Sequence, residues 1–132
     1  MGENYVLLSQ GAKKQNDVYL KAFKTYLKAL GLCEQTIKNH IRFANLYINE
    51  FLLLYEVHPL KDGCHMLDEF FTDWLIKQDI ALSDYQVKSI AASVKKFYAY
   101  MLELGLEITN EDFNFLVNSI KEHKDNWLVH HA

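Results

Sequence analysis

The stretch SDYQVKSIAASVKKFYAYMLELG, residues 83–105, decides the fold of this chain. Ser83 and Gln86 have the spacing of a capping box, in which each side chain binds the other residue's backbone N–H at a helix start. Apolar residues then return every three or four positions, which is typical of one buried helix face. Gly105 predicts the end of the helix, because glycine is common just beyond a helix C-terminus. The predicted buried residues are Val87, Ile90, Ala91, Val94, Phe97, Tyr98, Met101 and Leu102.

Two helices with the same apolar spacing are predicted upstream. The first ends at Gly31 and follows a weakly specified, flexible lead-in at residues 1–14. Its apolar positions are Val18, Leu20, Phe23, Tyr26, Leu27 and Leu30. The second helix is long and extends from Cys33 to about Tyr55, with opposite apolar and polar stripes. The apolar stripe is Ile37, Ile41, Ala44, Ile48, Phe51 and Leu52, and the polar stripe is Gln35, Lys38, Arg42, Asn45 and Asn49.

The remaining segments are a loop and two more helices. A loop is expected around Pro59 and Gly63, because proline and an Asp-Gly pair favour turns. A short helix follows at residues 67–75, and its exposed positions are acidic. The last helix begins at a cap that Thr109 or Asn110 provides.

Size and composition predict a single domain. The chain has 132 residues, half of them apolar, with one proline and five glycines. This much apolar material can form an ordinary core, and the scarcity of helix breakers favours long helices. We therefore expect an all-α bundle of four to five helices at residues 15–126. In the tail at 127–132, Trp127 and Leu128 either pack back on the bundle or dock elsewhere.

Several classes of protein lack their usual sequence motifs here. No apolar run approaches the roughly 18 residues of a membrane helix, and no signal-peptide pattern is present, so a cytoplasmic protein without a membrane partner is expected. Phosphate-binding loops, metal-binding histidine pairs and nucleophile elbows are missing from the sequence. Cys33 and Cys64 are expected to be free thiols. We expect no catalytic residue, metal, cofactor or small-molecule substrate.

Positive charge is concentrated in two regions, although the formal net charge is −3. Residues 13–42 contain seven basic and two acidic residues, and residues 85–105 contain three lysines and one glutamate. The intervening residues 43–84 contain eight acids and two lysines. Charge that is segregated in this way steers an anionic partner toward one part of a protein. Nucleic acid is the expected partner.

Two stretches resemble the N-terminal core-binding domain of tyrosine recombinases, the phage-integrase-like family. They are GLCEQTIKNHIRFANLYINEF, residues 31–51, and SIAASVKKFYAYMLELG, residues 89–105. In that family, a helix with a Thr-Ile-like pair after a polar turn runs into an apolar end with phenylalanine. A later helix carries a basic residue before a Phe-Tyr-like pair. The corresponding residues here are Thr36, Ile37, Phe51, Lys95, Phe97 and Tyr98.

The resemblance, which covers about residues 16–124, implies a SAM-like bundle whose two long helices lie against duplex DNA. It implies a role in DNA integration and recombination, with a recombinase catalytic domain or other recombinase subunits as further partners. No enzyme activity is expected, because the catalytic arginines, histidines and tyrosine of the family have no counterpart. The DNA-contacting candidates that the resemblance implies are Thr36, Lys38, Asn39, Arg42, Lys88, Ser89, Lys95 and Lys96.

Two other interpretations stay open. Residues 30–40 look like the turn and recognition helix of a helix-turn-helix transcription regulator, although the second helix is predicted to be longer than such a helix. The other alternative is a protein-interaction bundle that serves as an accessory or regulatory module. Its contacts would be the acidic third helix or the Trp127-Leu128 tail. Salt dependence distinguishes DNA binding from this alternative, because phosphate contacts release counterions.

Overall fold

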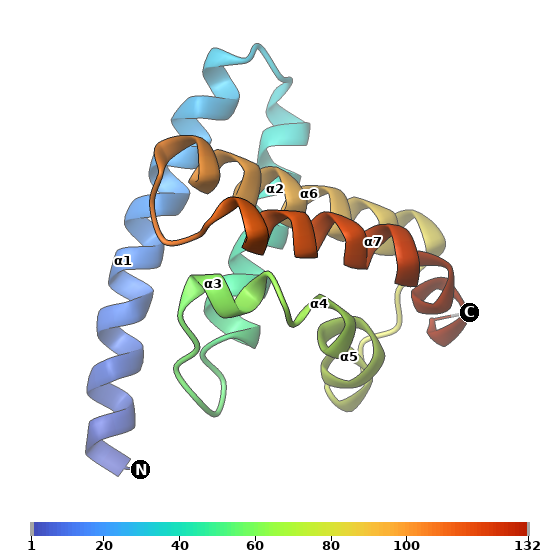
Figure 1. Cartoon of the computed structure of the whole chain (residues 1–132), viewed down its shortest axis with the longest axis horizontal. Helices are drawn as coiled ribbons and strands as arrows, with labels where there is room; N and C mark the ends of the chain where they lie inside the picture. The colour runs from blue at the N-terminus through green and yellow to red at the C-terminus, as the bar shows by residue number, and fades with distance from the viewer. Residues whose placement is uncertain (1, 132) are drawn as a thin grey trace.

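Residues 2–131, which the computed structural model describes, form helices and no strand. In chain order the elements are α1 (Gly2–Ala29), α2 (Glu34–Asn45), the π-helix η1 (Leu46–Phe51), α3 (Leu60–Gly63), α4 (Leu67–Glu69), the π-helix η2 (Phe70–Trp74), α5 (Leu75–Lys77), α6 (Asp84–Leu104) and α7 (Asn110–His130). Helix α6 packs against both α2 and α7, and the segment from α3 to α5 lies below them in Figure 1. The predicted all-α bundle is confirmed. None of the helices in this part of the chain is long and apolar enough to cross a membrane.

The ends of α6 and the start of α7 carry the caps that the sequence predicts. The Gln86 backbone N–H donates to Ser83 Oγ at 3.2 Å, and the Ser83 N–H donates to Gln86 Oε1 at 2.9 Å. Thr109 and Asp112 form a second capping box at the start of α7. Gly105 ends α6 with a φ of 71°, a left-handed conformation that strains residues with a Cβ atom. These predictions are confirmed.

Helix α1 begins at Gly2, so the predicted start of the first helix near residue 15 is wrong. No proline interrupts residues 2–14. The Tyr5 hydroxyl also ties this part of α1 to the bundle, because it donates to the backbone carbonyl groups of Leu53 and Leu54. The expected lead-in is therefore the first part of a continuous helix.

The apolar spacing in α1 predicts only part of its buried face. Leu20, Phe23 and Leu27 are buried, as expected. Val18 and Leu30 are 59% and 47% exposed, so their expected place in the core is wrong. Val18 lies about 200° around the helix from Leu20, and Leu30 lies beyond the last helical residue.

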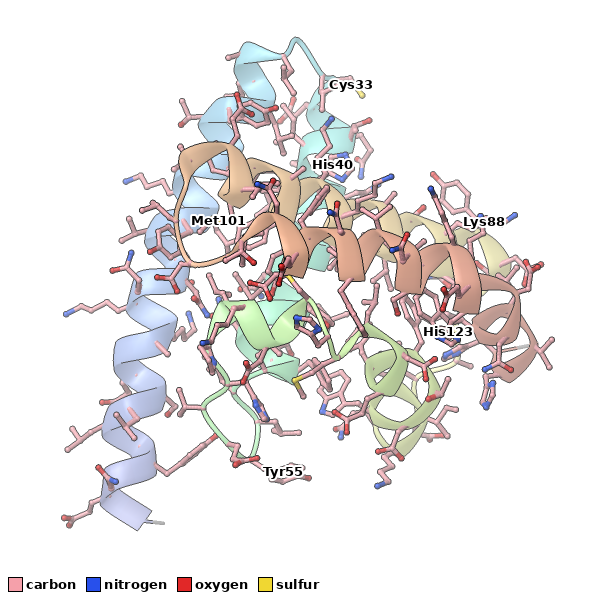
Figure 2. The ribbon with its side chains drawn as sticks, in the orientation of Figure 1. Cys33, His40, Tyr55, Lys88, Met101 and His123 are labelled. Carbon is pink, nitrogen blue, oxygen red and sulfur yellow. The ribbon has the colours of Figure 1, made fainter. Side chains whose placement is uncertain are left out.

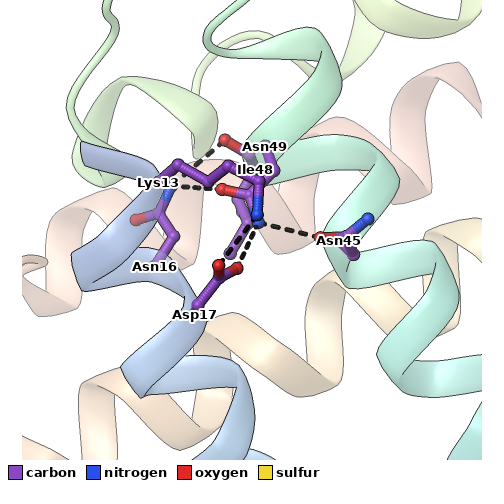
Figure 3. A network of polar contacts seen from close by, with 6 residues as sticks. All are labelled: Lys13, Asn16, Asp17, Asn45, Ile48 and Asn49. Carbon is purple, nitrogen blue, oxygen red and sulfur yellow. Dashed lines mark hydrogen bonds and ion pairs between the residues drawn. The ribbon is translucent and has the colours of Figure 1, made fainter. Parts of the chain in front are cut away.

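A polar network fixes α1 against the end of α2 (Figure 3). The Asn16 side chain is buried and donates to the Ile48 carbonyl oxygen at 3.2 Å and to Asn49 Oδ1 at 3.0 Å. Asn49 donates in turn to Asp17 Oδ1 at 3.0 Å and to Asn45 Oδ1 at 2.8 Å. Because the buried Asn16 amide of α1 has its partners on η1, the network favours one register of these two helices over a slipped one.

The second and third predicted helices each change helix type along their length. Helix α2 continues directly into η1, so the helical run extends from residue 34 to 51, longer than a usual recognition helix. A π-turn has i→i+5 hydrogen bonds and rotates the side chains that follow it. Tyr47, which the apolar stripe did not include, is fully buried and packs against Phe70 of η2. Ile41, which precedes η1, is only half-buried. The third helix extends over residues 67–77 with η2 in its middle.

The predicted loop around Pro59 contains the short helix α3, which belongs to the core. The Tyr47 hydroxyl donates to the Gly63 carbonyl oxygen at 2.6 Å, and the Tyr98 hydroxyl donates to that of Leu60 at 2.8 Å. Both buried tyrosines thereby satisfy their hydroxyl groups. Gly63 is required because a Cβ atom there would lie 2.1 Å from the Tyr98 hydroxyl oxygen. The Asp-Gly pair therefore serves close packing, which sequence patterns alone did not indicate.

Helix α7 continues to His130, so the predicted boundary between the domain and a tail at residue 127 is wrong. Trp127 is fully buried, and its ring stacks on Phe71 with centroids 4.5 Å apart. The Trp127 indole N–H donates to Asp68 Oδ1 at 2.7 Å. Of the two expected roles for Trp127, packing back on the bundle is confirmed, and the ring is not available to a partner.

Candidate nucleic-acid interface

Basic residues from α1 and α2 meet in a groove close to the turn that joins the two helices. The residues that line this hairpin groove are Lys24, Lys28, Leu32, Glu34, Ile37 and Lys38. Lys24 and Lys28 are four residues apart and therefore share one face of α1. Lys38 comes from α2 and lines the same groove. Three cations thus converge on a groove that contains a single acid, Glu34.

The charges of the hairpin groove are open to solvent. Lys38 Nζ lies 3.9 Å from Glu34 Oε1, and the two side chains are 68% and 88% exposed. An exposed pair of this kind contributes about 0–1 kcal/mol, so it holds Lys38 only weakly. No acidic residue occurs between Asp17 and Glu34, so α1 offers Lys24 and Lys28 no acid one turn away on the side of the groove. The groove therefore presents positive charge.

A second polar cluster lies where α2 and α6 pack together. His40 Nδ1 and Ser93 Oγ are 2.7 Å apart, and Figure 2 shows His40 beside α6. The pKa of His40 is lowered, chiefly by burial and also by the nearby charge of Lys96. His40 is therefore neutral at neutral pH. This contact places Lys96 next to α2, and Ser89 lies one turn before Ser93 on the same side of α6.

The other two candidate lysines of α6 occupy a different side of the helix. Lys88 and Lys95 are exposed and share a face through their seven-residue spacing. That face lies about 100° around the helix from Lys96. Figure 2 shows Lys88 near the start of α6, well away from His40. The structure therefore brings Lys96, but not Lys88, to the surface around α2.

The remaining candidates lie on α2 between the hairpin groove and α6. Thr36 is half-buried in the first turn of the helix. Asn39 is also half-buried, and its Oδ1 accepts a hydrogen bond from Gln35 Nε2 at 3.2 Å. The exposed Arg42 guanidinium lies 4.7 Å from the centre of the Phe43 ring, within the range of a cation–π contact.

Thiols and metal-ligating side chains are dispersed. Cys33 precedes α2, and hydrogen bonds with the Thr36 side chain and backbone lower the pKa of its thiol. Cys64 is buried, and burial together with the charge of Asp112 raises the pKa of its thiol to about 12. In the described part of the chain, no group of three or more histidine, cysteine or acidic residues is arranged to hold a metal ion.

Lys24 and Lys28 were missing from the predicted contacts. Their signal is present in the sequence, because both lie shortly before the turn at Gly31, and Lys38 lies at a similar distance after it. In two antiparallel helices, residues at equal distance from the turn lie opposite each other. A count outward from Gly31 therefore pairs the lysines of the first helix with Lys38.

The fold and this surface define an all-α bundle with a basic helical hairpin. No protein-family model, curated protein or solved structure matches the chain. The resemblance to the core-binding domain of tyrosine recombinases therefore stays a prediction, and function must be inferred from the geometry of the surface.

Proposed function

We propose that this protein binds double-stranded DNA without catalysing a reaction, as the core-binding domain of a phage-integrase-like tyrosine recombinase does. The observation that carries the proposal is the convergence of Lys24, Lys28 and Lys38 on one groove with a single acid. Lysines attract the phosphate backbone and release its counterions, which gives affinity that depends on salt. In this role the chain acts in the cytoplasm, together with a recombinase catalytic domain or other recombinase subunits.

Helix α2 is the element on which we place the duplex. It has the hairpin groove on one side and Lys96 on the other, with Asn39 and Arg42 between them. Lysines position a duplex through its phosphates and carry no sequence information. Arginine and asparagine can read base edges with paired hydrogen bonds, so Arg42 and Asn39 are the residues proposed for any sequence preference. Two such residues support weak sequence discrimination.

Fluorescence anisotropy with a labelled duplex of about 20 base pairs, titrated at several salt concentrations, tests this proposal. Three to four phosphate contacts predict that the logarithm of the binding constant falls with the logarithm of salt concentration with a slope of about −3. A duplex that does not bind at about 50 mM salt, or binding that does not change with salt, contradicts the proposal.

A pair of triple variants localises the contact. Replacement of Lys24, Lys28 and Lys38 by alanine removes the cations of the hairpin groove and is expected to weaken binding about ten-fold or more at low salt. The matched control replaces Lys61, Lys77 and Lys121, which are exposed elsewhere, and changes the net charge equally. Equal losses in the two variants would show that net charge, rather than the groove, attracts DNA.

A further inference from the structure

A groove of opposite character lies where the chain after η1 meets the segment from α4 to α5. We refer to it as the acidic groove. Its carboxylates and aromatic rings are Glu56, Glu69, Asp73, Phe51, Tyr55 and Trp74. Figure 2 shows Tyr55 at the end of the molecule opposite Cys33, which precedes α2. The acidic groove is therefore separate from the proposed DNA surface.

The charge balance of the acidic groove is negative. Lys77 and His58 are its basic lining residues, against three carboxylates. Lys77 Nζ lies 3.2 Å from Asp73 Oδ1, but both side chains are more than half exposed, so the pair is weak. His58 Nε2 lies 3.5 Å from Glu56 Oε2. Glu69 forms no ion pair with the residues that the structure describes, and its carboxylate is available to a cation.

The aromatic wall of the acidic groove is built by both π-helices. Phe51 ends η1 and Trp74 ends η2, and their ring centroids are 5.6 Å apart at an angle of 71°. Phe70 stacks behind Trp74, also at 5.6 Å. π-Turns inside helices are uncommon and frequent at functional sites, and here two of them meet at one groove. On the other rim, Tyr55 is 75% exposed, which leaves its ring free for contact.

The Trp74 indole adds a second signal. Its Nε1 atom is buried and has no hydrogen-bond partner among the described residues. Buried donors are normally paired, and each exception requires an explanation. This atom is closed to solvent, whereas the rest of the Trp74 side chain is half-buried and lines the acidic groove.

We propose that the acidic groove binds a segment of a partner protein that carries an arginine or lysine side chain. Aromatic faces attract such cations, and carboxylates form charge-assisted hydrogen bonds with them. A hydrated metal ion does not fit this combination of aromatic walls and dispersed carboxylates, because the described residues contain no metal-ligating cluster. This interaction is independent of DNA binding.

NMR titration of the full chain with a capped hexapeptide that contains two arginines tests the proposal. We expect the Trp74 indole N–H signal to shift with a dissociation constant below about 1 mM, while the buried Trp127 indole signal stays in place. The same peptide with citrulline in place of arginine keeps the shape and removes the charge, and its binding is expected to be lost. Equal shifts with both peptides, or no shift with the arginine peptide, overturn the proposal.

Variants separate the acidic groove from general attraction to an acidic protein. The double variant Glu69→Gln/Asp73→Asn is expected to bind the arginine peptide about five-fold more weakly, as for the loss of two exposed ion pairs. The control Asp125→Asn/Glu122→Gln removes the same charge from exposed positions of α7 outside the groove and is expected to keep the affinity. Equal weakening in both variants contradicts a specific site. Duplex binding measured on the same variants reports separately on the hairpin groove.

Discussion

The hairpin groove and the acidic groove differ in their backbone as well as in their charge. The first is built on regular α-helical turns, and its lysines come from positions that a 3.6-residue period places on one face. The second is walled by two π-helical segments, which break that period and bring Phe51 and Trp74 together. In a regular helix, the sequence spacing therefore shows which side chains share a face, whereas a π-turn conceals this.

The two grooves also differ in how far they depend on the core. The lysines of the hairpin groove are exposed, so their replacement is expected to change binding and leave folding intact. The acidic groove shares Phe51 with the core, and Phe70 behind its wall is fully buried. Changes in the aromatic wall of the acidic groove are therefore expected to affect the free energy of unfolding first, whereas its exposed carboxylates are not part of the core.

The largest effect is expected for Trp127→Ala, which removes the ring that stacks on Phe71 in η2. Loss of a large buried aromatic side chain is expected to lower the free energy of unfolding by about 3–5 kcal/mol, measured by urea denaturation. Trp127→Phe keeps a ring but loses the hydrogen bond to Asp68, so its loss is expected to be smaller. If Trp127→Ala lowered the free energy of unfolding by less than about 1 kcal/mol, the result would contradict the burial of this ring.

A smaller loss of stability is expected for Gly63→Ala in α3, which packs against the core. The added Cβ atom would lie 2.1 Å from the Tyr98 hydroxyl oxygen, so the backbone or the ring must move. We expect a cost of about 1–3 kcal/mol in thermal unfolding. Gly11→Ala on α1 is the control, because its Cβ atom meets nothing within 4 Å and alanine favours a helix. A neutral Gly63→Ala variant would contradict the packing of α3 against α6.

A comparison of two lysine variants on α6 tests how far along this helix the DNA contact extends. Lys96→Ala is expected to reduce the size of the salt slope for duplex binding by about 1, because Lys96 lies next to α2. Lys88→Ala is expected to leave the slope unchanged. A smaller slope for Lys88→Ala together with an unchanged slope for Lys96→Ala would show that DNA contacts the start of α6 rather than the surface next to the hairpin groove.

The smallest effect concerns the protonation of His40 beside Ser93 and Lys96. The folded-state pKa of His40 is lowered, so as pH falls through about 6.5 the unfolded chain takes up this proton before the folded chain does. The stability contributed by neutral His40 is thus present above that pH and is lost below it. Between pH values of about 7.5 and 5.5, wild-type protein is expected to lose more stability in urea denaturation than His40→Gln. Equal losses would show that another group titrates.

Local signals in the sequence predicted the fold well where the backbone is regular. The Ser83–Gln86 box and the stop at Gly105 appear as expected, and so does the buried face between them except at Leu102, which is only half-buried. Caps and helical period can be predicted because they depend on near neighbours in the sequence. Tyr47 and Gly63 were not predicted, since their places depend on contact with each other and with Tyr98 of α6. Trp127 had no such local signal, because the partner of its ring, Phe71, is distant in sequence.

The candidate site was predicted in part for the same reason. Lys38 and Lys96 were named from the helical spacing and the family resemblance, and the structure places each beside a neighbouring helix. Lys24 and Lys28 line the same groove as Lys38 because α1 packs beside α2, and this packing was not used in the prediction. The sequence named the acidic third helix as the contact surface of the protein-interaction alternative, but it did not indicate the groove, because the aromatic wall combines two segments that meet only in the folded chain.

An NMR titration of the labelled chain with duplex DNA tests the central claim most directly. We predict that backbone signals from the residues around Gly31, at the hairpin groove, shift as duplex is added and return when salt is raised. Signals from Glu69 and Trp74 in the acidic groove are predicted to stay in place. Shifts confined to the acidic groove, or an unchanged spectrum at low salt, would contradict the assignment of DNA binding to the basic hairpin.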